Sequence, residues 1–341
     1  MKLLKSVALC LVFLLVCKGA FSCTDFQIKA KDGSVVIGRT MEFPLDLKSR
    51  IWSVPRSANN KYAYLGIDAF GQQELIADGM NEKGLSVEGL MFAEAKYQTA
   101  VKGKKSVTLT RLCDHILGNF DNVEDVKKEF NNIRVLAEPI KKLGVLGLHL
   151  AVHDAKKNNL VVEFINGEVK IYDNPLGVMT NMPEFNWHLT NLSNYINLDP
   201  KDVKEIKMNG FKVGQKSVGN GLLGMPGDWT SASRFVRTAW NVSTALPAKN
   251  AAEAVDLASH LINSIDIPLG AIKEPHGLYG YAQWVVIKDL TNKVMYYRTY
   301  DNQTLKAIDM KKLDLNVGAK AKQISMEAGA PKVFDVTGSL F

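Results

Sequence analysis

The sequence predicts an α+β fold in which helices cover antiparallel β-sheets. Segments with the two-residue alternation of half-buried strands come in clusters, and several follow one another across short turns. Helical patterns are grouped in the middle of the chain, whereas a parallel fold would alternate single strands with single helices. There is no internal repeat, low-complexity tract or Pro/Ser-rich linker, so we expect one domain over residues 23–341.

The first predicted element is a β-hairpin. Residues 24–30 and 34–40 are β-prone, and the segment between them contains Asp32-Gly33, a dipeptide that favours tight hairpin turns. The next elements are strands at residues 61–70 and 84–92 and helices at about 106–119 and 122–132. A turn-rich segment, residues 78–84, separates the two strands.

The second half of the chain also contains predicted strands and helices. Three consecutive strands are expected at residues 146–155, 160–167 and 168–174, with Asn166-Gly167 at the turn between the last two. The remaining elements are a short helix at 187–196, a glycine-rich loop running into a helix at 219–240, an amphipathic helix at 250–265 and a hairpin of strands at 281–290 and 294–300.

Residues 1–22 have the layout of a signal peptide. Lys2 and Lys5 precede an apolar run over residues 6–17, and small residues, Ala20 and Ser22, stand three and one positions before Cys23. A retained membrane anchor is the alternative, but a spanning helix needs about 20 apolar residues and this run is shorter. We therefore expect export, to a periplasm or to the outside, with Cys23 as the first residue of the mature chain and no stable membrane span.

Composition limits the function classes. The chain carries a formal net charge of +7, with lysines scattered along it and no basic stripe interleaved with aromatic residues. Nucleic-acid binding therefore has little support. There is no G-x-S-x-G, no phosphate-binding loop and no H-E-x-x-H. His149 and His153 share a strand face and could in principle bind a metal, but no carboxylate cluster lies nearby in the sequence.

Two cysteines remain after the predicted cleavage. Cys113 lies in a segment where apolar residues recur at helical spacing, so we expect a buried thiol on the inner face of a helix, although a disulfide to Cys23 is the alternative. Cys23 is then a free cysteine in an exported chain, and such a residue is a candidate reactive group. A histidine partner for it would have to come from afar, for example His276.

A free N-terminal cysteine carries its own base. Its α-amino group titrates near 7.7–8.0, so a neutral amine is available to take the thiol proton and return it to a leaving amine. A nearby guanidinium would lower the thiol pKa, and a carboxylate would hold the amine. Arg39 and Glu42 are adjacent to Cys23 through the predicted hairpin. The alternative is that they form a surface ion pair at a strand end.

The chain resembles the choloylglycine hydrolase family, which includes conjugated bile acid hydrolases and penicillin V acylases. The matching stretches occur in order along nearly all of the mature chain: CTDFQIKAKDGSVVIGRTMEF, DGMNEKGLSVEGLMF, NPLGVMTNMPEFNWHLTNLSNY, GNGLLGMPGDWTSASRFVR and YYRTYDNQTLKAIDMKKLD. The resemblance implies an N-terminal-nucleophile αββα sandwich, hydrolysis of a linear non-peptide amide without metal or cofactor, and assembly as a homotetramer.

The resemblance also implies roles for individual residues. Cys23 matches the nucleophile and Arg39 the arginine beside it. Asn181 matches the asparagine that helps to bind the oxyanion, and Arg234 a second active-site arginine. Glu42 stands where the family usually has aspartate, and we expect it to hold the α-amine.

Met91 stands where bile salt hydrolases typically have asparagine, and the resemblance implies that its backbone N–H contributes to the oxyanion hole. Met41, Phe43 and Phe92 are soft, apolar residues near the predicted site, and with Met91 they suit an apolar acyl group; core packing is the alternative.

The expected substrate is a small-molecule amide with a large apolar acyl group. A conjugated bile salt is favoured, because the middle and C-terminal motifs look most like that branch of the family. Penicillin V or an N-acyl homoserine lactone is the alternative. A different class of protein, a binding protein anchored by a lipid on Cys23, is disfavoured by bulky Phe21 before the cleavage site.

Overall fold

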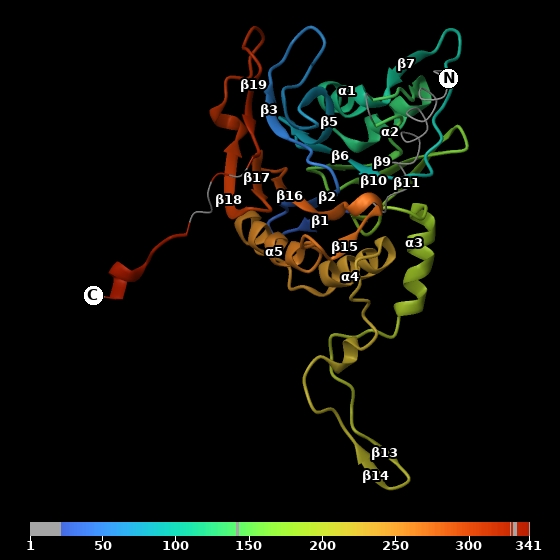
Figure 1. Cartoon of the computed structure of the whole chain (residues 1–341), viewed down its shortest axis with the longest axis vertical. Coiled ribbons are helices and arrows are strands. Elements are labelled where there is room, and N and C mark those ends of the chain that lie inside the picture. The colour runs from blue at the N-terminus through green and yellow to red at the C-terminus, as the bar shows by residue number, and fades with distance from the viewer. Residues whose placement is uncertain (1–21, 141–142, 328, 330–332, 341) are drawn as a thin grey trace, which may run out of the picture.

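The computed structural model describes residues 22–140, 143–327, 329 and 333–340 (Figure 1). The predicted signal peptide lies, except for Ser22, outside the described residues. No helix in the described part of the chain is both long and apolar enough to cross a membrane.

Two antiparallel sheets form the body of the molecule. The first, sheet A, contains in order β12 (Val178–Met179), β1 (Cys23–Lys29), β2 (Val35–Phe43), β16 (Tyr279–Asp289), β17 (Val294–Thr299) and β18 (Asn302–Asp309), with β15 (Ile272–Lys273) also paired to β16. The second, sheet B, contains β11 (Glu168–Asp173), β10 (Asn159–Ile165), β9 (Leu148–Asp154), β6 (Leu85–Met91), β5 (Gln72–Asn81), β4 (Tyr64–Ala69), β3 (Arg50–Val54) and β19 (Lys322–Ser325).

Helices cover the outer face of each sheet, which confirms the predicted αββα sandwich (Figure 1). α4 (Ser231–Thr244) and α5 (Ala251–Asn263) pack on sheet A, and α1 (Leu112–Asn119) and α2 (Val123–Asn132) pack on sheet B. Helix α3 (Phe185–Asn191) contacts α4. Side chains cap three of these helices: Asn122, Thr230 and Asn250 accept hydrogen bonds from backbone N–H groups in the first turns of α2, α4 and α5.

The central strands have no solvent-facing side. Every residue of β2 is buried, because its two faces lie against sheet B and against the helices on sheet A. One apolar cluster fills the space between the sheets and under α4 and α5, and a second lies between sheet B and the helices α1 and α2. Any charged side chain on these strands must therefore find its partners inside the protein.

The helix predicted at about 106–119 begins later than expected. Residues Lys105–Thr108 form strand β7, a 3₁₀ turn follows at Leu109–Arg111, and α1 starts at Leu112. Strand β7 pairs in parallel with β8 (Ile133–Leu136), a distant partner that local periodicity does not indicate. Cys113 lies buried in α1 as a free thiol, as predicted.

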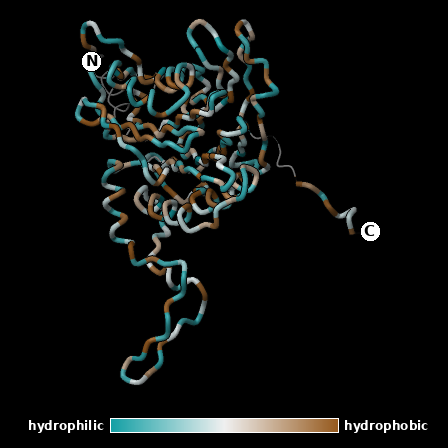
Figure 2. The backbone as a smooth tube through the Cα atoms, turned by 180° about the vertical axis from the view of Figure 1, so that it is seen from behind, coloured by the Kyte–Doolittle hydropathy of each residue, from teal (hydrophilic) through white to brown (hydrophobic). Residues whose placement is uncertain are grey.

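A hairpin that the sequence analysis did not predict projects from the body (Figures 1 and 2). It consists of β13 (Ile206–Met208) and β14 (Phe211–Val213), and all six of these residues are exposed. The strands are short and surrounded by polar residues, so they carry little periodic signal. We call this hairpin and its flanks, residues 199–225, the arm.

Candidate active site

Cys23 begins strand β1 and lies directly opposite Met41 on β2. Side chains alternate along a strand, so Cys23 and Asp25 share one face of sheet A, and Arg39 and Met41 share the same face on β2. That face looks toward sheet B, as the contacts of Asp25 and Arg39 with β9 and β5 show. The Sγ atom of Cys23 lies 3.8 Å from the sulfur of Met41, and the residue is 1% exposed.

Asn181 and Arg234 meet at the main chain of Cys23. The Oδ1 atom of Asn181 accepts a hydrogen bond from the nitrogen of Cys23 at 2.6 Å and another from Arg234 at 2.8 Å. Both of these groups can only donate, so the side-chain oxygen of Asn181 must face them. The Nδ2 atom then points the other way and donates to the carbonyl oxygen of Met91 at 2.9 Å.

Arg234 also donates to the carbonyl oxygen of Cys23 at 2.6 Å and to Oγ1 of Thr24 at 2.5 Å. It reaches these atoms from α4, on the outer side of sheet A. Arg39 approaches from the opposite side, between the sheets. Its guanidinium donates to Asp78 at 2.8 Å and to the carbonyl oxygen of Gly89 at 2.6 Å, and both charged side chains of this ion pair are fully buried.

The thiol of Cys23 is not activated while the chain continues into Ser22. Burial raises its pKa, the charge of Arg39 opposes this effect, and the nearby Glu42 carboxyl adds to it. The nitrogen of Cys23 is here a peptide nitrogen, so no amine is present to accept the thiol proton. Cutting the bond after Ser22 would supply that amine at the point where Asn181 already holds the nitrogen.

Glu42 lies on the opposite face of β2 from Arg39 and Met41. Its backbone N–H donates to the carbonyl oxygen of Ser22 at 3.1 Å. Its carboxylate is buried, and the nearby Thr40 side chain favours its charged form. Burial raises the pKa of this carboxyl to about 8, against the opposing charge of Arg234. The role of holding the α-amine stays a prediction, because that amine forms only when the chain is cut.

Two cavities meet at Met91. The larger, about 600 Å³, is lined by Ser22, Met91 and Asn181 together with residues around the start of α4 and in β15. The smaller, about 40 Å³, is apolar and is lined by Cys23, Met41, Phe43 and Met91 among others. Phe92 lines neither cavity; its ring stacks on His149 with the centroids 4.9 Å apart.

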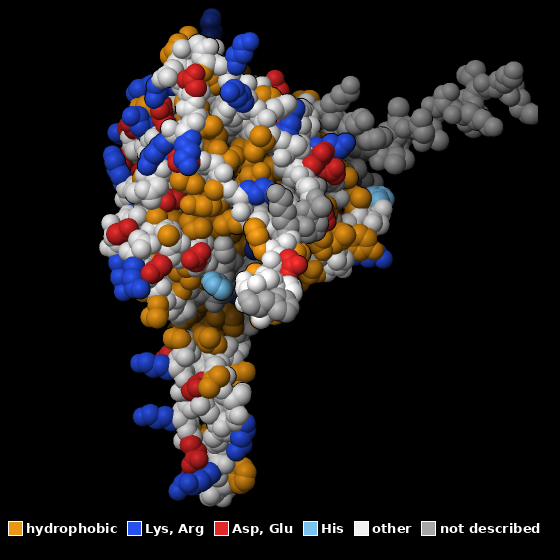
Figure 3. All heavy atoms as spheres, turned by 90° about the vertical axis from the view of Figure 1, so that its left-hand side faces the viewer, with side chains coloured by type: hydrophobic (Ala, Val, Ile, Leu, Met, Phe, Trp, Pro, Cys, Tyr) orange, Lys and Arg blue, Asp and Glu red, His pale blue; other side chains and the backbone are white. Residues whose placement is uncertain are grey.

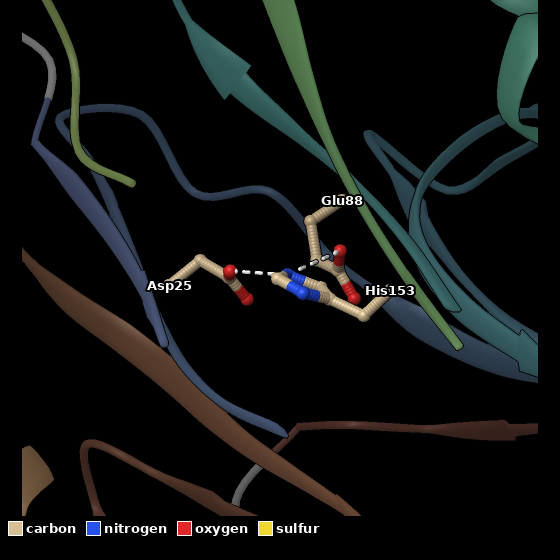
Figure 4. A group of neighbouring side chains, drawn as sticks. All are labelled: Asp25, Glu88 and His153. Carbon is tan, nitrogen blue, oxygen red and sulfur yellow. Dashed lines mark hydrogen bonds and ion pairs between the residues drawn. The ribbon is translucent and has the colours of Figure 1, made fainter. Parts of the chain in front are cut away.

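The two histidines that suggested a metal site on one strand are both buried in β9. His153 forms a compact group with Asp25 from β1 and Glu88 from β6, and the ligand atoms of the three lie within 4.8 Å of one another (Figure 4). However, His153 donates to Asp25 at 2.6 Å, and Glu88 accepts from the ammonium of Lys288. A metal ion would have to displace these cationic donors.

Charge balance supports that interpretation. Although burial opposes a charged ring, the carboxylate of Asp25 raises the pKa of His153 to about 9. The fully buried group between the sheets then contains three cations and three anions: Arg39, Lys288 and His153 with Asp25, Asp78 and Glu88. A neutral set of paired charges is the form in which buried ions are tolerated.

Most of this network is not predicted from the sequence. Lys288 was the available signal, because it interrupts the apolar run of β16 and must be paired if that strand is buried. His276, the candidate histidine partner for Cys23, lies exposed in a 3₁₀ turn before β16 and lines neither cavity. Arg39, Glu42, Asn181 and Arg234 are all brought to Cys23, through contacts or through their charges.

Solved structures share this architecture. The structure superposes with a TM-score of 0.85 on a variant of the conjugated bile acid hydrolase from Clostridium perfringens, at 29% identity, covering 92% of this chain and all of that one. It superposes with a TM-score of 0.74 on penicillin V acylase from Agrobacterium tumefaciens, covering 90% and 92%. At 23% identity, the second likeness bears on the fold alone.

The fold is therefore the αββα sandwich of the N-terminal-nucleophile hydrolases. The sequence is 32% identical over 311 residues to the bile salt hydrolase/transferase of Clostridium perfringens, covering 86% of this chain and 94% of the relative. The model of the linear amide C–N hydrolases, choloylglycine hydrolase family, matches residues 23–323. The chain belongs to this family and is a hydrolase of carbon–nitrogen bonds other than peptide bonds.

The first prediction concerns the thiol. In the unprocessed chain, Cys23 should react with iodoacetamide at neutral pH at least about tenfold more slowly than free cysteine, because it is buried and its pKa is raised. Peptide mapping by mass spectrometry separates Cys23 from the other cysteines, and buried Cys113 is the internal control. Labelling of Cys23 as fast as free cysteine would contradict the geometry described here.

The second prediction concerns Glu42. Its pKa is raised in the folded chain, so the unfolded chain releases this proton first, and stability is lost as the pH rises from about 4.5 to about 8. Glu42→Gln removes this loss. Both proteins are measured as the chain that retains Ser22. The melting temperature of Glu42→Gln minus that of wild type should increase by about 4 °C between pH 5 and pH 8. Glu42→Asp, which still titrates, is the control, and a pH-independent difference for Gln would refute the assignment.

Proposed function

We propose that the protein is an exported amidase that uses Cys23 as an N-terminal nucleophile and acts on conjugated bile salts. One observation carries this proposal. At the residue that the predicted cleavage would expose, Asn181 and Arg234 form hydrogen bonds with the main chain, and the charge of Arg39 acts on the thiol. The bile-salt assignment is supported by the relative that is 32% identical over nearly its whole length.

The proposed reaction uses groups of this chain alone. After cleavage, the free α-amine of Cys23 takes the thiol proton, and the thiolate attacks the amide carbonyl carbon. The tetrahedral intermediate collapses to a thioester as the ammonium returns its proton to the departing amine. Water, deprotonated by the same amine, then hydrolyses the thioester and releases the carboxylic acid, restoring the thiol.

Asn181 and the backbone N–H of Met91 would bind the developing oxyanion. The Nδ2 atom of Asn181 is already directed at the Met91 main chain, 2.9 Å from its carbonyl oxygen. A backbone donor is independent of the side chain, so methionine at this position is compatible with the role. Loss of one oxyanion donor typically costs about 10²–10³ in rate.

The charged residues would tune this reaction. Arg39 opposes the burial that raises the pKa of the thiol, so it favours the thiolate once water reaches the site. Glu42 lies opposite Ser22 on β2, next to the position where the new α-amine forms. An ammonium there would pair with this buried carboxyl.

The two cavities that share Met91 suggest where the two halves of an amide substrate would lie. We assign the acyl half to the apolar cavity beside Sγ, lined by Met41 and Phe43, and the amine half to the larger cavity, whose lining includes Asp228 and Lys273. The larger volume is in the usual range for small-molecule sites. The apolar cavity is only about 40 Å³, so a steroid-sized acyl group requires its side chains to move apart.

The small volume of the apolar cavity favours a second candidate substrate class within the family. Phenoxyacetyl and unbranched fatty acyl groups are slimmer than a steroid, so penicillin V or an N-acyl homoserine lactone would enter with less rearrangement. Bile salts remain first, since two relatives named bile salt hydrolase/transferase, from Clostridium perfringens and Lactiplantibacillus plantarum, are each 32% identical, whereas the penicillin V acylase of Pectobacterium atrosepticum is 24% identical.

We also propose that the protein assembles as a homotetramer through its arm. Alternation places Ile206, Met208, Phe211 and Val213 on one face of the hairpin and Lys207 and Lys212 on the other. The apolar face is exposed, with Phe211 at 73%, and the arm stands clear of the body (Figure 3). A lone two-stranded hairpin is marginally stable in water, so contacts with the other copies in a tetramer that cover this face would stabilise it.

The third prediction tests the enzyme. The processed protein should hydrolyse at least one of glycine- or taurine-conjugated bile salts, penicillin V and N-acyl homoserine lactones, ranked by kcat/KM. Cys23→Ser should lose at least about 10³-fold in kcat and retain its melting temperature, because the hydroxyl is a much weaker nucleophile. Activity retained in this variant would place the nucleophile elsewhere.

Intact-mass analysis of the exported protein provides the control for this experiment. A chain that begins at Cys23 without added mass agrees with the proposal. A diacylated Cys23 would instead support the lipid-anchored binding protein, since a thioether has no free thiol.

The fourth prediction tests the arm. Phe211→Asp should lower the molar mass in light scattering from that of a tetramer toward that of a single chain, because it places a charge in the proposed apolar contact. Lys212→Gln, on the opposite face of the same strand, is the matched control and should leave the mass unchanged. A monomeric wild-type protein would refute the assembly.

A further inference from the structure

Two buried histidines hold the main chain around Asn181. His149, on β9, lies with Nε2 2.9 Å from the carbonyl oxygen of Thr180. His188, on α3, lies with Nε2 2.8 Å from the carbonyl oxygen of Asn181 itself. A carbonyl can only accept, so both Nε2 atoms carry a proton and donate it. The carbonyl groups of the consecutive residues Thr180 and Asn181 therefore each accept a hydrogen bond from an imidazole.

His149 is itself fixed by Glu163 on the next strand. Its Nδ1 atom lies 3.2 Å from Oε1 of Glu163, and the same oxygen accepts from the backbone N–H of Phe185 at 3.0 Å. Because Nε2 already donates, a second proton must lie between Nδ1 and Glu163. Both side chains are fully buried, so this pair links β9 and β10 to the segment that leads into α3.

His188 works as a neutral ring. Burial lowers its pKa to about 4, so near neutral pH the ring holds one proton, and the acceptor at Asn181 places that proton on Nε2. The ring stacks on Phe235 of α4, with the centroids 4.7 Å apart. Its donor is therefore constant over the neutral range and its plane is held by packing.

These contacts matter because Asn181 is not in a sheet. It lies between the end of β12 at Met179 and the start of α3 at Phe185, where no strand pairing holds the backbone. Its backbone N–H donates to Oγ of Ser231 at 2.9 Å, and its carbonyl oxygen accepts from His188. Both polar atoms of this residue's main chain are thus fixed by side chains, while its own side chain contacts the nitrogen of Cys23.

We propose that His149 and His188 are positioning residues that hold the Asn181 side-chain amide at Cys23. His188 acts more directly, because it bonds the carbonyl oxygen of Asn181 itself. This inference rests on the proposed function, in which that amide binds the oxyanion. Neither histidine lies in the linings of the two cavities, so they act through Asn181 and not on the substrate. The effect of their loss should accordingly fall on kcat and spare KM.

The fifth prediction follows. His188→Ala should lower kcat about 10–100-fold and change KM less than about twofold, since a displacement of about 1 Å at a catalytic group costs roughly a hundredfold. His188→Gln, whose amide N–H₂ can occupy the position of Nε2, should return kcat to within about threefold of wild type. Phe235→Leu is the comparison variant: it removes the ring stack that holds the plane of His188 but leaves the Nε2 donor in place, so it should lower kcat by less than His188→Ala does.

The outcomes separate this inference from the proposed function. An inactive wild-type protein, or an active Cys23→Ser variant, would refute the proposed function. If wild type is active and Cys23→Ser is not, the inference is overturned when His188→Ala matches wild type in kcat, or when His188→Gln is as slow as His188→Ala. A crystal structure of His188→Ala gives a test without substrate: we expect the Asn181 amide to leave the Cys23 nitrogen, and an unmoved amide would overturn the inference.

Discussion

The antiparallel pairing of β1 with β2, in the register that sets Cys23 opposite Met41, is the constraint on which the site depends. Because side chains alternate, this register sends Cys23 and Arg39 toward sheet B and leaves Glu42 on the helix side of sheet A. A slip of one residue would exchange these faces. The thiol would then lie under α4 and α5, away from both the apolar cavity and Arg39.

The sandwich is stable with charged side chains between its sheets only because these charges are paired. Arg39 reaches Asp78, and Lys288 links that carboxylate to Glu88. An unpaired ion between the sheets would cost several kcal/mol, whereas a neutral, hydrogen-bonded set is tolerated. The same pairing holds the guanidinium beside Cys23, so the interactions that make the interior stable also place the charge that acts on the thiol.

Much of the fold could be predicted from the sequence, because the signals for its strands and helices lie within short segments. Alternation and turn residues indicated the strands of β1, β2, β16 and β17, and the amphipathic pattern of residues 250–265 indicated α5. Local signals are not enough where a partner is distant: residues 106–108 continue a helical pattern, but they belong to β7, whose pairing with β8 lies outside any local window. At the site, Cys23, Arg39 and Glu42 could be argued from one hairpin, whereas Asn181 and Arg234 came from family resemblance.

The sequence by itself therefore determined the α+β class, the family and the hairpin that carries Cys23, since these depend on periodicity and on motifs within short segments. Only the tertiary structure decided what surrounds that cysteine. It brought Asn181 from beyond β12 and Arg234 from α4 to the same main-chain group, and it placed His188 behind Asn181. The physical reason is that a hydrogen bond depends on distance and direction in space, and residues more than a hundred positions apart acquire these only when the sheets and helices pack.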